Sequence, residues 1–164
     1  MTYDPRRVVD DLNALAAHTG GPEGSRRLAW TPEWLQARAM LRESLTTLPV
    51  EVDEDEAGNL WAVLRGERDD MLVVGSHLDS VPKGGWLDGA LGVMSGLELL
   101  RSMAEEGTPP VTVALVDWAD EEGARFSRSL FGSAARVGTL DGGVPAARSA
   151  LASTPPTLRP GWGR

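Results

Sequence analysis

The sequence predicts an α/β fold built on a mainly parallel sheet. Three segments follow one another along the chain: a short apolar run at residues 71–75, a stretch with helical periodicity at residues 91–103, and a second apolar run at residues 111–118. A strand, a helix and a strand in that order form a βαβ unit, with parallel strands and a right-handed crossover. Helices upstream of this unit would flank the sheet, because their apolar faces need a surface to cover.

Two helices are expected before the βαβ unit. Asp4 followed by Pro5 is typical of a helix cap and first turn, and apolar residues then recur at helical spacing up to a pair of glycines. Thr31 followed by Pro32 repeats the start signal, and a second apolar face continues until Pro49. Each helix therefore offers one face to a core.

A β-hairpin is expected between the second helix and the βαβ unit. Residues 50–53 and 60–64 have the composition of strands and are joined by a loose acidic turn. The acidic run at residues 53–56 is most simply solvated. A metal site there is an alternative, but the run contains no histidine and lies on a flexible tip.

Length and composition indicate one folded domain with a tail. A chain of 164 residues can fold around a single core, and 41% hydrophobic with 24% charged residues is ordinary for a globular protein. Residues 141–164 are instead rich in glycine, proline, alanine, serine and arginine, and have little apolar periodicity. We therefore expect a folded domain over residues 1–140 and a disordered tail over residues 141–164.

The composition also excludes several kinds of protein. With no cysteine, the chain has no disulfide and no thiolate metal site, so a bound metal needs histidine and carboxylate ligands. A net charge of −8 with scattered basic residues argues against a nucleic-acid partner. No apolar run could span a bilayer and the first residues lack a signal-peptide core, so we expect no membrane partner and a cytoplasmic location.

Chemically useful side chains follow both strands of the βαβ unit. His77 and Asp79 come directly after the first strand, and Glu121 and Glu122 come after the second. In open α/β sheets, ligands bind outside the carboxyl ends of the strands, and adjacent parallel strands would bring these two loops together. Several carboxylates gathered there would repel one another unless a cation neutralised them.

Each of these residues also has an interpretation without function. His77 alone could be a hydrogen-bonded structural histidine, but Asp79 two residues later suits a ligating imidazole, whose other N–H usually donates to a carboxylate. Asp88, in a glycine-rich loop, could approach a buried centre or could cap the following helix. Glu121 and Glu122 could belong to a solvated acidic loop.

The combination indicates a metal-assisted hydrolase. One histidine with several carboxylates suits zinc, manganese or cobalt better than magnesium, which tends to prefer oxygen ligands alone. Two metal ions sharing a carboxylate could polarise a carbonyl and lower the pKa of a bridging water, and a free carboxylate nearby could act as general base. The residues themselves do not specify the substrate.

Two longer motifs resemble those of a known enzyme family. GSHLDSVPKGGWLDGALGV at residues 75–93 and EEGARFSRSLFGSAARVG at residues 121–138 resemble the two metal motifs of the metal-dependent amidohydrolases. That family includes N-carbamoyl-L-amino-acid hydrolase, β-ureidopropionase and allantoate amidohydrolase. Weaker similarity extends through residues 24–34 and 55–66, so the resemblance covers most of the chain before its tail.

The resemblance implies a role for each residue. Of two divalent metal ions, zinc or else manganese or cobalt, His77 would bind one, Glu122 the other, and Asp88 would bridge them. Glu121 would be the general base, and Asp79 would orient His77. The implied fold is a zinc-exopeptidase-like catalytic domain. The implied reaction is hydrolysis of a non-peptide C–N bond in a small carbamoyl, ureido or allantoate-type substrate.

The resemblance also implies a truncated catalytic domain. Family members are much longer, and they take one further histidine for each metal, and a domain for homodimerisation, from segments that this chain does not contain. The chain's other histidine, His18, falls on the first predicted helix. The alternatives are an inactive fragment, a degenerate metal-binding or interaction domain, or a related dinuclear aminopeptidase or deacylase. A truncated domain would also expose an unpaired sheet edge.

Overall fold

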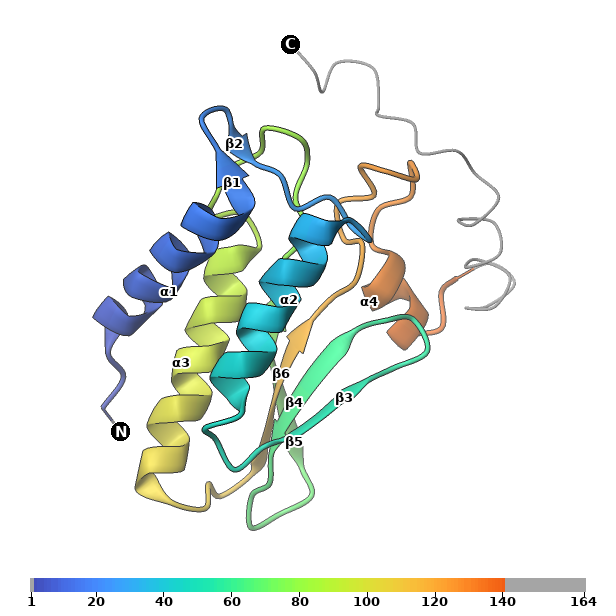
Figure 1. Ribbon diagram of the computed structural model, residues 1–164. Coiled ribbons are helices and arrows are strands. Elements are labelled where there is room, and N and C mark those ends of the chain that lie inside the picture. Colours follow the sequence, from blue (N-terminus) through green and yellow to red (C-terminus); the bar gives the residue numbers. More distant parts are fainter. Residues whose placement is uncertain (1, 141–164) are drawn as a thin grey trace.

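The computed structural model describes residues 2–140 and shows a sheet with helices packed on one of its faces (Figure 1). The described elements, in chain order, are α1 (Pro5–Thr19), β1 (Gly20–Gly21), β2 (Gly24–Ser25), α2 (Pro32–Leu45), β3 (Glu51–Glu54), β4 (Leu60–Leu64), β5 (Met71–Ser76), α3 (Ala90–Glu106), β6 (Thr112–Asp117) and α4 (Phe131–Arg136). The predicted tail at residues 141–164 lies outside the described residues. None of the described helices is long and apolar enough to cross a membrane.

Both predicted N-terminal helices are confirmed, with the expected caps. The Asp4 side chain accepts a hydrogen bond from the Arg6 N–H at the start of α1, which ends at Gly20. The Thr31 side chain accepts one from the Trp34 N–H at the start of α2. Each cap satisfies a backbone donor that the first turn of a helix leaves without a partner.

The sheet is mixed, and the expectation of a mainly parallel sheet is wrong. Its strand order is β3-β4-β6-β5. The predicted βαβ unit is confirmed, because β5 and β6 pair in parallel. The β3–β4 and β4–β6 pairings are antiparallel. Parallel strands need a crossover of about a dozen residues, and the connection at residues 65–70 is too short for one, so β5 runs opposite to β4. Strand β6 lies between them, and it is therefore antiparallel to β4 and parallel to β5.

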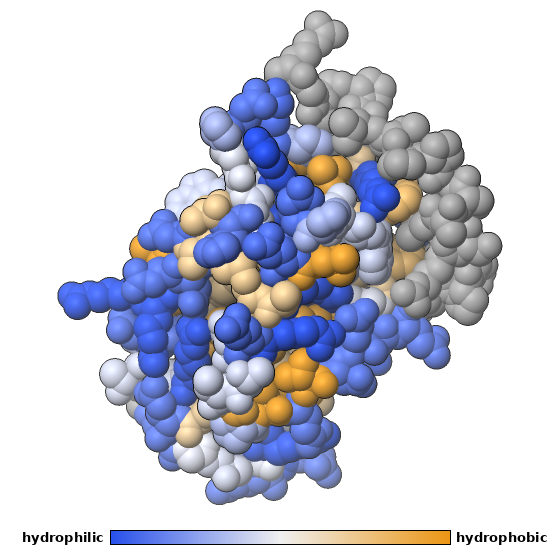
Figure 2. All heavy atoms as spheres, in the orientation of Figure 1, coloured by the Kyte–Doolittle hydropathy of each residue, from blue (hydrophilic) through white to orange (hydrophobic). Residues whose placement is uncertain are grey.

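One hydrophobic core lies between the sheet and the helices. Helix α3 packs directly on β5 and β6, and α1 packs against both α2 and α3 (Figure 1). The buried residues of this core come mainly from α1, α2 and α3 and from β4 and β6, among them Leu12, Leu15, Leu41, Leu60, Leu97, Val113 and Leu115. Figure 2 shows the face seen in Figure 1, where hydrophobic residues form small separate patches among hydrophilic ones.

The parallel pair determines where a site can form. Its register runs from Met71 opposite Thr112 to Ser76 opposite Asp117, so both strands end at the same edge of the sheet. The loops that follow β5 and β6 therefore emerge side by side. Within the described residues β5 is also an edge strand, and its Met71, Leu72 and Val73 are exposed, as the expectation of an unpaired edge requires.

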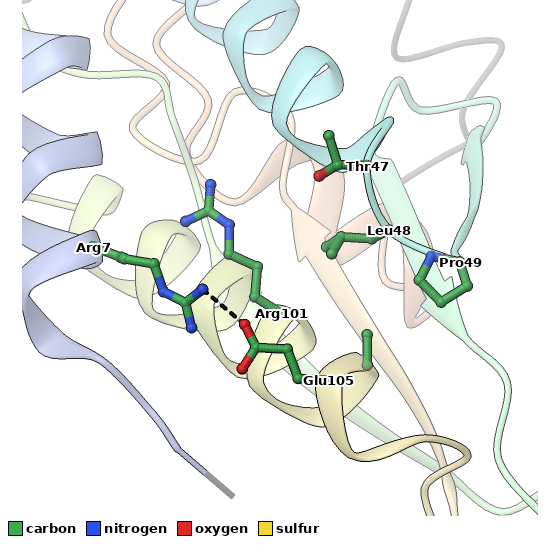
Figure 3. A pocket seen from close by; sticks show the side chains of 7 residues that line it. Arg7, Thr47, Leu48, Pro49, Arg101 and Glu105 are labelled. Carbon is green, nitrogen blue, oxygen red and sulfur yellow. Dashed lines mark hydrogen bonds and ion pairs between the residues drawn. The ribbon is translucent and has the colours of Figure 1, made fainter.

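A separate pocket lies at the other end of α3, away from these loops (Figure 3). It is a cavity of about 370 Å³ lined by Arg7, Thr47, Leu48, Pro49, Arg101, Ala104 and Glu105. Its arginines are already paired: Arg7 with Glu98 and Glu105, and Arg101 with Asp11. The acidic partners cancel the positive charge that an anionic ligand would need.

Candidate metal centre

His77 follows β5 and lies almost fully buried, with 9% of its side chain exposed. Its Nδ1 is 3.0 Å from the backbone oxygen of Asp79 and 3.5 Å from Asp79 Oδ1. A carbonyl oxygen can only accept a hydrogen bond, so Nδ1 carries a proton. In the neutral ring the lone pair is then on Nε2, which is the form of histidine that binds a metal.

Asp79 connects the two loops. Besides its contact with His77, its Oδ1 accepts a hydrogen bond from the Glu121 N–H at 3.2 Å, and its Oδ2 accepts one from the Glu122 N–H at 3.1 Å. The side chain is 1% exposed. Sequence reasoning assigned Asp79 to His77 alone and missed this link between the loop after β5 and the loop after β6.

Glu121 faces the free side of the His77 ring. Its Oε2 is 3.6 Å from Nε2. A carboxylate therefore lies beside the ring nitrogen that carries the lone pair. Within residues 2–140, however, no group of three or more histidine and acidic side chains is close enough to hold a metal ion. The donor set fits a metal chemically, but it is incomplete.

Glu122 interacts electrostatically with both His77 and Asp88. Burial raises the pKa of Glu122, the charge of His77 lowers it and the charge of Asp88 raises it, so both residues are within electrostatic reach of Glu122. The alternative that Asp88 caps the next helix is wrong, because the cap position of α3 is Gly89 and no side chain bonds there. His18, by contrast, is exposed on α1.

Gly89 allows the loop to pass close to His77. Its φ is +65°, and a Cβ at this position would lie 2.5 Å from Cε1 of the His77 ring. A contact below 3.0 Å between a Cβ and a ring atom is a clash, and a positive φ disfavours every residue with a side chain. Glycine is therefore required beside Asp88.

Asn59 attaches the second loop to the sheet and was not identified from the sequence. Its Oδ1 accepts a hydrogen bond from the Ala119 N–H at 2.9 Å, and its Nδ2 donates to the Gly132 oxygen at 3.0 Å. The side chain is fully buried. A Gly-Asn pair at a hairpin turn is ordinary in itself, so local sequence gave no signal for this contact.

The site raises the pKa of its histidine and of two buried aspartates beside it. Burial alone would lower the pKa of His77, but the hydrogen bond and charge of Asp79, with the charge of Glu121, raise it to about 9. Burial raises the pKa of Asp120 to about 7, with a contribution from the charge of Asp79. Burial raises the pKa of Asp117 to about 6, against the charge of Arg38.

The raised pKa of His77 predicts that the metal-free chain loses stability in mild alkali. Protonated His77 contributes fully below its unfolded pKa of 6.5, and the contribution disappears as pH rises through about 9. The free energy of unfolding should therefore fall by about 3 kcal/mol between these two pH values. Urea denaturation with a chelator present measures it. His77→Gln should remove this pH dependence and His18→Gln should keep it; an unchanged slope in His77→Gln would contradict the assignment.

The part of the sequence that contains both motifs matches a known protein family. Residues 59–145 match the model described as peptidase family M28. The chain belongs to peptidase family M28. The matched residues include both loops of the candidate centre, from His77 to Glu122.

Relatives found by sequence comparison agree with the resemblance found in the motifs. N-carbamoyl-L-amino acid amidohydrolase of Geobacillus stearothermophilus is 42% identical over 122 residues, which are 71% of this chain and 29% of that protein. Allantoate amidohydrolase of Bacillus subtilis is 32% identical over 137 residues, which are 81% of this chain and 33% of that protein. The chain thus spans about a third of the length of these relatives.

Solved structures support the same M28-type fold. A hydantoinase/carbamoylase family amidase from Burkholderia ambifaria superposes with a TM-score of 0.81 at 30% identity, over 95% of this chain and 42% of that one. The α/β prediction is therefore confirmed at the level of the whole fold, and so is the similarity to the amidohydrolases.

Proposed function

We propose that the chain carries one part of a two-metal amidohydrolase centre. In this proposal His77 binds one divalent ion, Glu122 binds the other and Asp88 bridges them, while Glu121 serves as the general base. The substrate is a small N-carbamoyl, ureido or allantoate-type compound, as the names of the relatives suggest. The full-length protein would be cytoplasmic and homodimeric. The observation that carries the proposal is the position of His77, with Nδ1 fixed by Asp79 and Nε2 facing Glu121.

The side chains suit these roles. The bound cations, zinc or manganese or cobalt, would supply charge that polarises the substrate's carbonyl and makes a water molecule more acidic. Asp79 holds the ring of His77 and also fixes the backbone of Glu121 and Glu122, so base and ligands keep a constant spacing. Glu121, with 28% of its side chain exposed, can accept a proton from water at the edge of the site.

A second candidate function is a metal-binding or interaction domain without catalysis. It is favoured by the absence, within the described residues, of any group of three donor side chains. A catalytic zinc ion normally has three protein ligands. Residues from outside residues 2–140 would therefore have to complete the centre before the chain could turn over a substrate.

A chimeric enzyme tests the first proposal. The segment of the Geobacillus stearothermophilus amidohydrolase that matches this chain is replaced by residues 1–140, and ammonia release from N-carbamoyl-L-amino acids is measured with added zinc or manganese. We expect turnover, because the relative supplies the missing ligands. A chimera that melts cooperatively and retains metal but shows no turnover would contradict the amidohydrolase proposal and favour the second candidate.

A further inference from the structure

The backbone of Leu78, between His77 and Asp79, is held on both sides by buried charged side chains. Its N–H donates to Asp117 Oδ1 at 2.7 Å, and its carbonyl oxygen accepts a hydrogen bond from Arg27 Nε at 2.8 Å. Both Asp117 and Arg27 are completely buried. The backbone at this point therefore cannot rotate without breaking a charge-assisted hydrogen bond on one side or the other.

Both charged side chains are themselves fixed to other elements. The second oxygen of Asp117 accepts a hydrogen bond from Arg38 Nε at 2.7 Å, and Arg38 stacks 4.3 Å over the ring of Trp34 on α2. Arg27 is fixed through its backbone, because its N–H donates to Ser80 Oγ at 3.1 Å and its carbonyl accepts from the Ser80 N–H at 2.8 Å. The loop after β5 is thus attached to α2 and to the segment after β2.

Stability alone is a weak reason for these buried charges. One terminal nitrogen of Arg27 has no hydrogen-bond partner within the described residues. A buried charge is costly to desolvate, and well-packed apolar side chains of similar volume often give equal stability. What apolar side chains could not provide is an acceptor for the backbone N–H and a donor to the carbonyl oxygen of the same residue.

We propose that Arg27 and Asp117 are positioning residues for the metal centre, which hold the backbone N–H and carbonyl of Leu78 and thereby place Nε2 of His77 and the carboxylate of Asp79. They act through Leu78 and do not themselves contact a metal or a substrate. The inference rests on the proposed function, because it assigns the fixed geometry of His77 to metal binding.

Metal affinity of the full chain tests the proposal. Co²⁺ is titrated into the wild type, Arg27→Met, Asp117→Asn and the control Glu98→Gln, which removes another buried carboxylate, the partner of Arg7 at the contact between α1 and α3. We expect affinity about 10- to 100-fold weaker in Arg27→Met, as is typical when a group supporting a metal ligand is removed. Glu98→Gln should lose stability comparably but bind Co²⁺ within about twofold of the wild type, since nothing at the centre changes.

A second readout needs no metal. Hydrogen exchange at the Leu78 amide should be faster in Asp117→Asn than the change in global stability explains. In the Co²⁺ titration, Arg27→Lys, which keeps a charged donor, should restore part of the affinity lost in Arg27→Met. The Lys variant also keeps the test usable if Arg27→Met does not fold. Wild-type affinity in both Arg27→Met and Asp117→Asn would overturn the positioning role, whereas a folded, metal-loaded wild-type chimera without turnover would overturn the proposed function itself.

Discussion

Replacing Glu121 by glutamine in the chimeric amidohydrolase is expected to lower kcat by about 10²- to 10⁴-fold, the usual contribution of a general base. Glutamine has nearly the same shape but cannot take up a proton. The backbone N–H of residue 121 would still donate to Asp79, so the loop should stay in place. KM and metal content should therefore change little, which is the pattern of an interaction needed mainly in the transition state.

The neighbouring residue provides a matched control for this prediction. Glu122→Gln removes a proposed metal ligand one position away, and it should reduce metal content before it reduces the rate per metal-loaded enzyme. Metal analysis and kcat measured on the same samples separate the two effects. If Glu121→Gln lost its metal while Glu122→Gln kept it, the roles of the two glutamates would have to be exchanged.

Asp79→Ala is expected to have the largest effect on the isolated chain. The substitution removes the acceptor for the Glu121 and Glu122 N–H groups and the carboxylate beside His77, all in a buried position. Hydrogen bonds to a charged group contribute about 1.5–3 kcal/mol each, so the free energy of unfolding should fall by about 3 kcal/mol or more. Metal affinity should fall beyond detection, because the two loops are no longer held together.

Urea denaturation and Co²⁺ titration of the same protein check both parts of this prediction. Glu98→Gln is again the control, since it disrupts buried hydrogen bonds in the α1–α3 contact and leaves the loops intact. Asp79→Asn, which keeps one acceptor oxygen, should lie between Asp79→Ala and the wild type. Undiminished metal affinity in Asp79→Ala would show that the loops do not need this link.

Much of the fold could be predicted because its signals are local. Residues within a few positions of each helix determine it: the caps at Asp4 and Thr31 begin α1 and α2, and the apolar periodicity of its own sequence defines α3. Helix α4 was missed because it has six residues and follows Leu130, which has a positive φ and forms no side-chain cap. The antiparallel β4–β6 pairing was also missed, because which strands become neighbours depends on contacts distant in sequence.

Part of the candidate site could also be predicted from the sequence, and part of it could not. That His77, Asp79 and Glu121 meet could be anticipated from two strand ends at one edge of the sheet. The backbone partners of the side chains could not. The contacts of Asp79 with two N–H groups, and those of Arg27 and Asp117 with the backbone of Leu78, depend on the three-dimensional path of the loops. A buried arginine also looks no different from an exposed one in the sequence.

Every role proposed for the metal centre requires that Nε2 of His77 binds a metal ion. Long-range proton–nitrogen NMR of the ¹⁵N-labelled chain observes it directly, and the chain's two histidines give an internal reference, since His18 is exposed and its Nδ1 is 2.8 Å from the Ala14 oxygen. On titration with Zn²⁺, the account predicts a saturable shift at Nε2 of His77, with the His18 signals unchanged. Signals of His77 that stay constant, or that move only together with those of His18, would contradict it.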